Sequence, residues 1–236
     1  EKTLIIVKSE SSLERIYSEL VSCGMKERYL ARLGNSLDCA KLSADYVNLL
    51  KQAIELVNTK ICLPLGLSEV ETCNDCDYLW KVIIQPRWKT FSVLMDSSAA
   101  MKDLQSSYPF ITCKGIEMNS FEGHFRGITD LFNNIRELSA IEHLKSSGAI
   151  ATFVLSSVSK VILITSAYAS THHHSLSKMN IGFDNFFVDD AHFIPESESL
   201  LHLLLQKDSR RLKRLSLFGH AILSSDLTLF QRFLAY

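Results

Sequence analysis

The expected fold rests on one stretch, Phe186-Phe187-Val188-Asp189-Asp190, in which an apolar run ends in two acids. A short apolar run of this kind is typical of a strand buried in a parallel sheet. At the C-terminal end of such a strand, side chains face the crevice where ligands bind. In P-loop nucleotide hydrolases one acid here holds Mg²⁺, and a second can orient or deprotonate the attacking water. Two acids after a strand are also typical of a solvated turn, so both interpretations remain open.

Similar apolar runs occur on both sides of this stretch, at residues 3–7, 29–33, 160–165 and 215–219. Helical spacing of apolar residues appears at about 11–23 and 198–206. Ser9 or Ser11 is expected to cap the first of these helices, with Glu14 completing a capping box for Ser11, and Gly24 is expected to end it. Short strands that alternate with helices predict an α/β fold with a mostly parallel sheet.

The middle of the chain has a different pattern. Apolar residues at about 46–57, 78–91 and 125–144 suit amphipathic helices, and alternating strands are not evident there. Pro86 lies inside the second of these helices and should kink or break it. The sequence therefore predicts three parts: core residues 1–35, a helical insertion at residues 36–147, and core residues 148–236.

Composition excludes several classes of protein. The chain has 236 residues, 47% of them hydrophobic, and its 25 Lys+Arg and 26 Asp+Glu give a net charge of −1. These values exclude a disordered tail, a small disulfide scaffold and a self-sufficient basic RNA-binding module, but they leave a local basic groove open. There is no run of about 20 uninterrupted apolar residues, so no membrane partner is expected. Because the chain opens on a strand and without Met, we expect a segment of something longer.

The six cysteines are expected to be reduced. Cys73-Asn74-Asp75-Cys76 has the spacing of half a zinc site, but no second cysteine or histidine pair follows at the spacing that a four-ligand site needs. Two free cysteines at the start of a helix are therefore preferred, and no metal site is predicted.

In this order, the segments resemble the first motor domain of the Aquarius-type, intron-binding, helicase-like proteins of the superfamily-one RNA helicase group. The segments that carry the resemblance lie at residues 3–9, 28–34, 46–48, 54–56, 87–88, 183–191, 203–206, 211–214 and 229–233. The resemblance implies a RecA-like, P-loop NTPase fold with a helical stalk-like insertion. It also implies a nuclear protein of the spliceosome that binds intron RNA and spliceosomal proteins as part of a large complex in pre-mRNA splicing.

The resemblance also assigns residues. Loops that contact RNA in the family correspond to Lys8-Ser9-Glu10 and to Thr165-Ser166-Ala167 in this chain. The paired Mg²⁺ and water acids correspond to Asp189 and Asp190, which we treat as vestigial.

Three positions, Phe193, His220 and Leu223, depart from the family pattern around Gly219. Phe193 stands where the family has a nucleotide-sensing Gln, and Phe has no group for such hydrogen bonds. After the strand at 215–219 the family reads Gly-Asp, two residues, then Gln-Leu-Pro-Pro. This chain keeps Gly219 but has His220 and Leu223 in place of the Asp and the Gln. The phosphate-binding loop is not in the chain, and in the family it lies just upstream. ATP and Mg are therefore expected as cofactors only if that loop is intact.

These observations leave three hypotheses. The first is a spliceosomal helicase-like protein with degenerate ATPase motifs, an inactive or weakly active pseudo-enzyme. The second is an active ATP-dependent RNA helicase that uses Asp189 and Asp190 together with an upstream phosphate loop. The third is a protein-binding scaffold without RNA contact.

Two further groups invite a functional interpretation. Residues 172–174 are three consecutive histidines, and on a helix they cannot all face one ion, so a solvated face is favoured over RNA contact. A basic cluster, Arg210, Arg211, Lys213 and Arg214, is typical of a solvated turn, with binding of RNA or of an acidic partner as the alternative.

Overall fold

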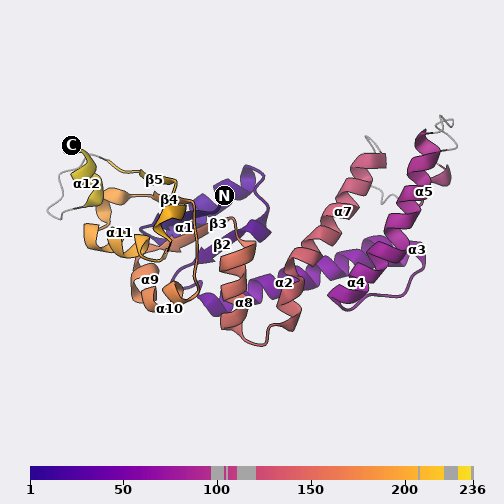
Figure 1. Ribbon diagram of the computed structural model, residues 1–236, viewed down its shortest axis with the longest axis horizontal. Coiled ribbons are helices and arrows are strands. Elements are labelled where there is room, and N and C mark those ends of the chain that lie inside the picture. Colours follow the sequence, from indigo (N-terminus) through magenta and orange to yellow (C-terminus); the bar gives the residue numbers. More distant parts are fainter. Residues whose placement is uncertain (97–103, 105, 111–120, 207, 221–227, 235–236) are drawn as a thin grey trace. The chain divides into compact units, whose positions relative to one another are not determined.

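The computed structural model describes residues 1–96, 104, 106–110, 121–206, 208–220 and 228–234 (Figure 1). The chain divides into two compact units. The first, which we call the sheet unit, consists of residues Glu1–Tyr46 and Leu144–Tyr236, and the second, the helical unit, consists of Val47–His143.

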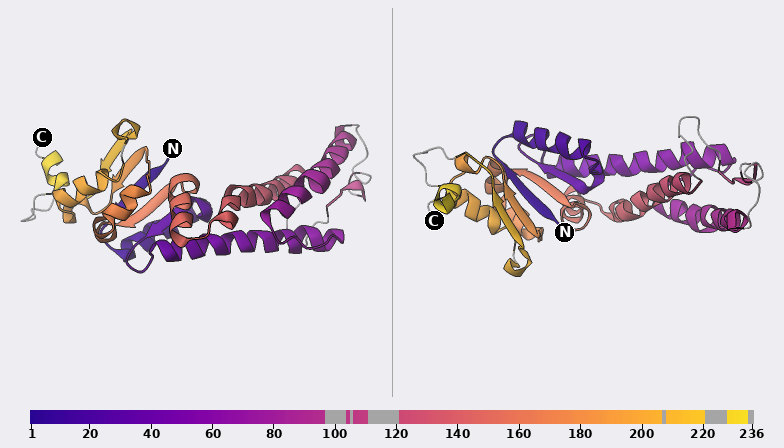
Figure 2. Two further views of the ribbon diagram at one scale, coloured as in Figure 1. Left: turned by 60° about the horizontal axis from the view of Figure 1, so that its bottom comes forward. Right: turned by 90° about the horizontal axis from the view of Figure 1, so that it is seen from above.

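The sheet unit is built around five strands in the order β2-β3-β1-β4-β5, and every neighbouring pair is parallel (Figure 2). The strands are β1 (Thr3–Val7), β2 (Leu30–Leu33), β3 (Val161–Thr165), β4 (Asn185–Val188) and β5 (Arg214–Leu217). The helices are α1 (Glu10–Ser22), α8 (Ser147–Phe153), α9 (Ser166–Thr171), α10 (His173–Lys178), α11 (Glu196–Leu203) and α12 (Leu229–Leu234), and the first part of α2 (Cys39–Val57) also belongs here. The predicted α/β fold with a parallel sheet is confirmed.

Burial explains why these runs form a parallel sheet. All five residues of β3 are buried, because β3 lies between two other strands and side chains cover both of its faces. On one face, Val7 and Leu163 form a core with Leu13 of α1, and Ile16 and Leu20 pack against it. β5 lies at the edge of the sheet and is more exposed.

Helix α1 shows how local chemistry sets its bounds. The Ser9 hydroxyl accepts a hydrogen bond from the Ser12 backbone N–H at 3.2 Å, so the cap is Ser9 and the capping box expected at Ser11 does not form. Gly24 follows the helix with φ of +87°, a conformation that favours glycine and is typical of a helix end.

The helical unit contains the rest of α2, α3 (Leu63–Leu65), α4 (Cys73–Leu79), α5 (Gln85–Asp96) and α7 (Phe121–Leu138). Two π-helical segments, η2 (Asn58–Cys62) and η3 (Trp80–Ile84), join α2 to α3 and α4 to α5. The chain therefore stays helical through Pro86, and the break that the sequence allowed there does not occur. The wide turn directly before Pro86 accommodates a residue that has no N–H and whose ring would clash in a regular helix.

Aromatic rings form much of the core of the helical unit. Trp80 lies 5.1 Å from Phe132 between ring centroids, and Trp88 is stacked on Phe125 at 4.1 Å. Phe91, 2% exposed, contacts the rings of Tyr108 and Phe121. Both tryptophans are half-buried, and the rings join η3 and α5 to α7.

Candidate functional site

The parallel sheet brings the predicted site residues to one edge. Val7 is in register with Thr165, Ile6 with Val188, and Val188 with Leu217. Because all the strands run the same way, the residues that follow them emerge side by side at the C-terminal edge of the sheet, where ligands bind in open α/β folds. Lys8, Ser166, Asp189 and Phe218 are the first residues beyond these strands.

The loop after β1 presents one free charge. Lys8 is exposed and makes no ion pair among the described residues, whereas Ser9 is engaged as the cap of α1. Glu10 is held by Ser36, whose backbone N–H and hydroxyl donate to its carboxylate at 3.0 and 2.6 Å. These hydrogen bonds lower the pKa of Glu10, so its carboxylate stays ionised beside the loop.

The loop after β3 is closed by internal hydrogen bonds. Thr165 and Ser166 are 3% and 1% exposed. The Thr165 hydroxyl accepts from the Tyr168 N–H at 3.4 Å as the cap of α9, and the Ser166 hydroxyl donates to the Glu198 carboxylate at 2.5 Å. Only Ala167 of this loop is exposed. The two hydroxyls therefore shape the loop rather than face solvent.

A buried histidine lies beneath that loop. His202 is 0% exposed, and its Nε2 lies 3.2 Å from the Ser166 carbonyl oxygen and 3.1 Å from the Ser170 hydroxyl. Its Nδ1 and the Nε2 of His173 are buried and have no hydrogen-bond partner among the described residues. Burial lowers the pKa of His202, which favours the neutral ring at neutral pH.

The paired acids after β4 have different surroundings. Asp189 donates its backbone N–H to the Ile6 carbonyl at 2.9 Å, and its carboxylate is 3.3 Å from the Arg15 guanidinium of α1. Asp190 has φ of +52°, a left-handed conformation that Asp tolerates better than most residues, and its carboxylate has no partner among the described residues. β4 thus ends at Val188, where the apolar run ends, and the chain turns at the two acids.

The degenerate positions surround a second histidine. His192 is 3% exposed, and its Nδ1 accepts the His220 backbone N–H at 3.3 Å. A Cβ at Gly219 would lie 2.9 Å from that nitrogen, so the ring occupies the space beside the end of β5. Phe193 is 56% exposed and its ring centroid lies 3.9 Å from that of His192. Leu223 lies outside the described residues.

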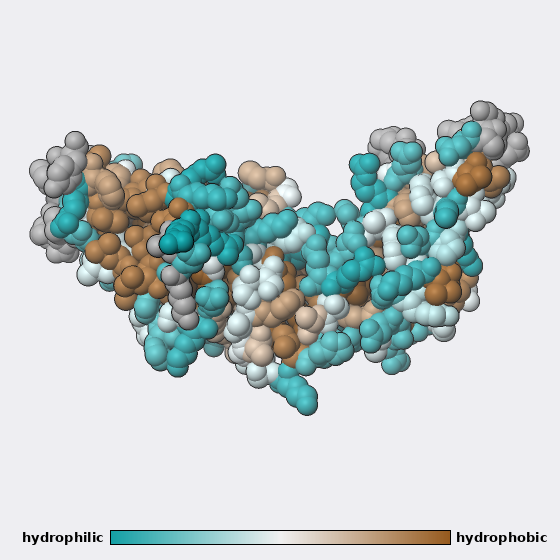
Figure 3. Space-filling model, in the orientation of Figure 1, coloured by the Kyte–Doolittle hydropathy of each residue, from teal (hydrophilic) through white to brown (hydrophobic). Residues whose placement is uncertain are grey.

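Large apolar side chains are exposed beside this edge. Phe193, Leu204, Phe218 and Phe233 are each more than half exposed. The brown area at the left of Figure 3 lies over α11, α12 and β5. Leu204, Phe218 and Phe233 belong to these elements or are adjacent to them, and Phe193 ends the short helix η6 (Ala191–Phe193). Exposed apolar patches of this kind mark surfaces that bind proteins or other apolar partners.

The basic cluster is partly neutralised. Lys213 and Arg214 each lie 3.2 Å from the Glu1 carboxylate, and Arg211 lies 3.6 Å from Asp184. These ion pairs hold the start of β1 beside the segment that leads into β5, so the cluster has a structural role. Of the triple histidine, His172 is stacked on Tyr168 with ring centroids 4.1 Å apart, which places it against the sheet unit's own core.

Cys73 and Cys76 lie in the helical unit, at the start of α4. Both are buried, and burial raises the pKa of each thiol to about 12, so both are neutral at physiological pH. No group of three or more His, Cys, Asp or Glu residues suitable for a metal ion occurs among the described residues.

Sequence patterns indicated the acids and the loops but missed four residues that control them. Arg15, His192, Glu198 and His202 act on the predicted site from neighbouring elements. Arg15 lies on the surface of α1, far in sequence from Asp189. Glu198 and His202 are 32 and 36 residues from Ser166, and His192 contacts His220 from another loop. No local motif therefore marks these four residues.

The chain is similar in sequence to a known RNA helicase. The chain is 27% identical over 253 aligned positions to the RNA helicase aquarius of the mouse, Mus musculus, and the match covers 93% of this chain. The chain spans 17% of the length of that relative. No family model matches the chain. None of the helices in the described residues combines the length and apolar character that crossing a bilayer requires.

Proposed function

We propose that this chain, an Aquarius-like and helicase-related sequence, uses a RecA-like sheet unit to bind intron RNA and spliceosomal proteins in the nucleus without robust ATP hydrolysis. In this proposal the helical unit is the stalk-like insertion of the family, expected from the sequence at residues 36–147. The chain acts as one part of a large splicing complex.

The observation that carries the proposal is the set of side chains that surround the paired acids. Asp189, the position that would serve Mg²⁺, lies 3.3 Å from Arg15, whose positive charge opposes a cation at the same carboxylate. Phe193 offers no hydrogen bond to a nucleotide, and the buried His192 ring fills the space next to Gly219. These three features support a weakened Mg²⁺-nucleotide site, because catalytic groups that act as a unit usually fail together.

RNA contact is proposed for the loop after β1. Lys8 is an exposed cation without an ion pair among the described residues, and Ser9 lies next to it at the same sheet edge. A lysine of this kind contributes to RNA affinity mainly through phosphate. For the loop after β3, we propose that the buried hydroxyls of Thr165 and Ser166 fix the backbone, so that the loop meets RNA through its exposed Ala167.

Protein binding is proposed for the exposed apolar surface around α11, α12 and β5, which supports a place in an assembly (Figure 3). The scaffold hypothesis shares this surface and differs only in lacking RNA. Crosslinking in assembled spliceosomes separates the two, because the scaffold hypothesis predicts no intron RNA at Lys8 or Ser9.

The decisive experiment measures RNA-stimulated ATP hydrolysis by the full-length protein and by its Asp190→Asn variant. Asn also tolerates the left-handed conformation at this position, so the variant should keep its fold. We expect slow turnover that the substitution does not change. Robust turnover that Asp190→Asn abolishes would instead establish the active helicase.

A matched pair of lysines tests the RNA contact. Lys8→Ala should weaken binding of single-stranded RNA and reduce the slope of log affinity against log salt by about 0.7, the value for one phosphate contact. Lys178→Ala, at an exposed lysine in α10, should change neither quantity. Equal effects of the two substitutions would mean that the basic surface acts without a defined site.

A further inference from the structure

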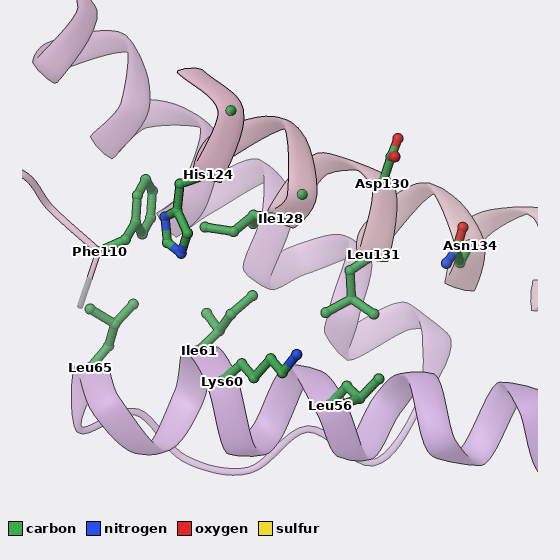
Figure 4. Close-up of a pocket in the computed structure, with 12 residues that line it drawn as sticks. Leu56, Lys60, Ile61, Leu65, Phe110, His124, Ile128, Asp130, Leu131 and Asn134 are labelled. Carbon is green, nitrogen blue, oxygen red and sulfur yellow. The ribbon is translucent and has the colours of Figure 1, made fainter. Parts of the chain in front are cut away.

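The helical unit contains a cavity that the proposed function does not use. Its volume is about 330 Å³, and it lies between α7 and the helical segment formed by the end of α2, η2 and α3 (Figure 4). Leu56, Ile61, Leu65, Phe110, Ile128 and Leu131 supply its apolar lining. In Figure 4, His124 points from α7 toward Ile61 and Leu65, and Ile128 points toward the His124 ring, so side chains from both sides converge on a trough between the helices.

Two glycines open one wall of this cavity. Gly123 and Gly127 line it from successive turns of α7. Glycine inside a helix is less favourable than alanine by about 0.5–1 kcal/mol. A Cβ at Gly127 would meet no atom within 4 Å, so packing within the chain does not require this glycine. At Gly127 the wall of the cavity is therefore backbone that no side chain covers.

The polar groups at the cavity favour an acidic partner. Lys60 lines the cavity and makes no ion pair among the described residues. The Asp130 carboxylate points away from the cavity in Figure 4, so Lys60 supplies the charge that faces an occupant. The Asn134 Oδ1 is buried without a hydrogen-bond partner in the described part of the chain, which leaves an acceptor for an incoming donor.

We propose that this cavity binds an amphipathic helix of a partner protein. The helix inserts two apolar side chains, one turn apart, beside Gly123 and Gly127 and places a carboxylate against Lys60. This is the helix-in-groove mode, in which apolar anchors at i and i+4 enter a groove. The volume lies at the small end of the range of about 300–1,000 Å³ for ligand pockets, which suits two side chains better than a large ligand.

The test uses the whole chain and a displayed library of helical peptides about four turns long, randomised at every position. Selection on the wild-type chain is followed by counter-selection on Gly127→Leu, which fills the cavity. Gly148→Leu is the matched control, because Gly148 is an exposed helical glycine in the sheet unit whose Cβ also meets no atom within 4 Å. Near-ultraviolet circular dichroism of Trp80 and Trp88 checks that the variants keep the core of the helical unit.

We expect the enriched peptides to carry an apolar pair four residues apart and a nearby acid. Gly127→Leu should weaken their binding by at least about tenfold, as loss of a central anchor does, and Gly148→Leu should leave it unchanged. Lys60→Glu should also weaken binding, and a peptide with Lys in place of its acid should restore it.

Three results would overturn the proposal. In the first, no peptide is enriched that discriminates against Gly127→Leu. In the second, only small apolar compounds occupy the cavity, which makes it a small-molecule site. In the third, sedimentation shows self-association that Gly127→Leu abolishes, which makes the occupant a second copy of the chain.

Discussion

Two glycines show how differently the two units use space. In the sheet unit, a methyl group at Gly219 would lie 2.9 Å from Nδ1 of His192, whereas in the helical unit one at Gly127 would meet nothing within 4 Å. The His192 ring fills the space beside Gly219. No side chain fills the space beside Gly127. The chain therefore closes the first position itself and leaves the second open.

The buried cores of the sheet unit and the helical unit also differ in the residues that form them. Aliphatic residues such as Ile6, Ile162 and Ile164 form the interior of the sheet, and hydrogen bonds between parallel strands fix their register. Rings such as Phe91 and Phe132 join the elements of the helical unit, whose helices have no ladder of hydrogen bonds between them. The helical unit therefore depends more on a few large side chains.

The largest expected effect tests that dependence. Phe132→Ala should cost about 3–5 kcal/mol of unfolding free energy, because Phe132 is 3% exposed and contacts Trp80. Ile162→Ala in β3 should cost about 2–5 kcal/mol. Hydrogen exchange should show faster exchange in α4 and α7 for the first variant and in β1 and β3 for the second. If Phe132→Ala lowered the protection of β1 and β3 just as much, the two units would unfold as one.

A smaller effect is expected at the filled sheet edge. Gly219→Ala should destabilise the chain by about 1–3 kcal/mol, because the added methyl group overlaps the His192 ring. Denaturant unfolding measures the loss. His192→Ala should remove part of it when the two substitutions are combined, and strict additivity in that double-mutant cycle would show that the two residues do not interact.

Acid should destabilise both units, for the same reason in each. Burial lowers the folded-state pKa of His202 and of His124, so below the unfolded pKa of about 6.5 the unfolded chain binds more protons and stability falls with pH. One such histidine contributes at most about 1.4 kcal/mol per pH unit. The slope of unfolding free energy between about pH 7 and pH 5 should flatten in His202→Gln and, separately, in His124→Gln. An unchanged slope would mean that the buried ring is already protonated.

The smallest effect has the opposite sign. Gly127→Ala should stabilise the helical unit by about 0.5–1 kcal/mol, since the new methyl group restricts the unfolded chain and meets no atom in the fold. Thermal melting detects the change. Gly148→Ala, in the first turn of α8, should give a smaller gain. Destabilisation by Gly127→Ala would show that the glycine already serves a contact within the chain.

The pattern of apolar runs was sufficient to predict the α/β fold and the parallel sheet. Each run is short, bounded by turn residues and separated from the next by a helix or a long helical region, and that arrangement has few solutions. The order β2-β3-β1-β4-β5 was not predictable, because register and neighbours depend on contacts between segments more than 100 residues apart, such as Thr3 with Val161.

The candidate site also has features that the sequence predicts and features that only the structure reveals. Sequence placed Asp189 and Asp190 at the end of a strand and identified Phe193 and His220 as departures from a pattern, because residue identity is local information. That Arg15 neutralises Asp189, and that Thr165 and Ser166 are buried, are facts about distant partners. The cavity beside α7 is also beyond sequence, because Leu56 and Leu131 face each other only once the helices have packed.

The sequence by itself determined the class of fold, the edge at which the candidate residues would meet, and the apolar side chain at position 193. Those properties depend on the periodicity and the chemistry of single residues. The tertiary structure alone decided that Asp189 forms an ion pair, that the hydroxyls of Thr165 and Ser166 are buried, and that a cavity remains beside α7. Pairing and burial arise when segments far apart in the chain come together, and the free energy of a charge or a hydroxyl group depends on what then lies within a few ångströms of it.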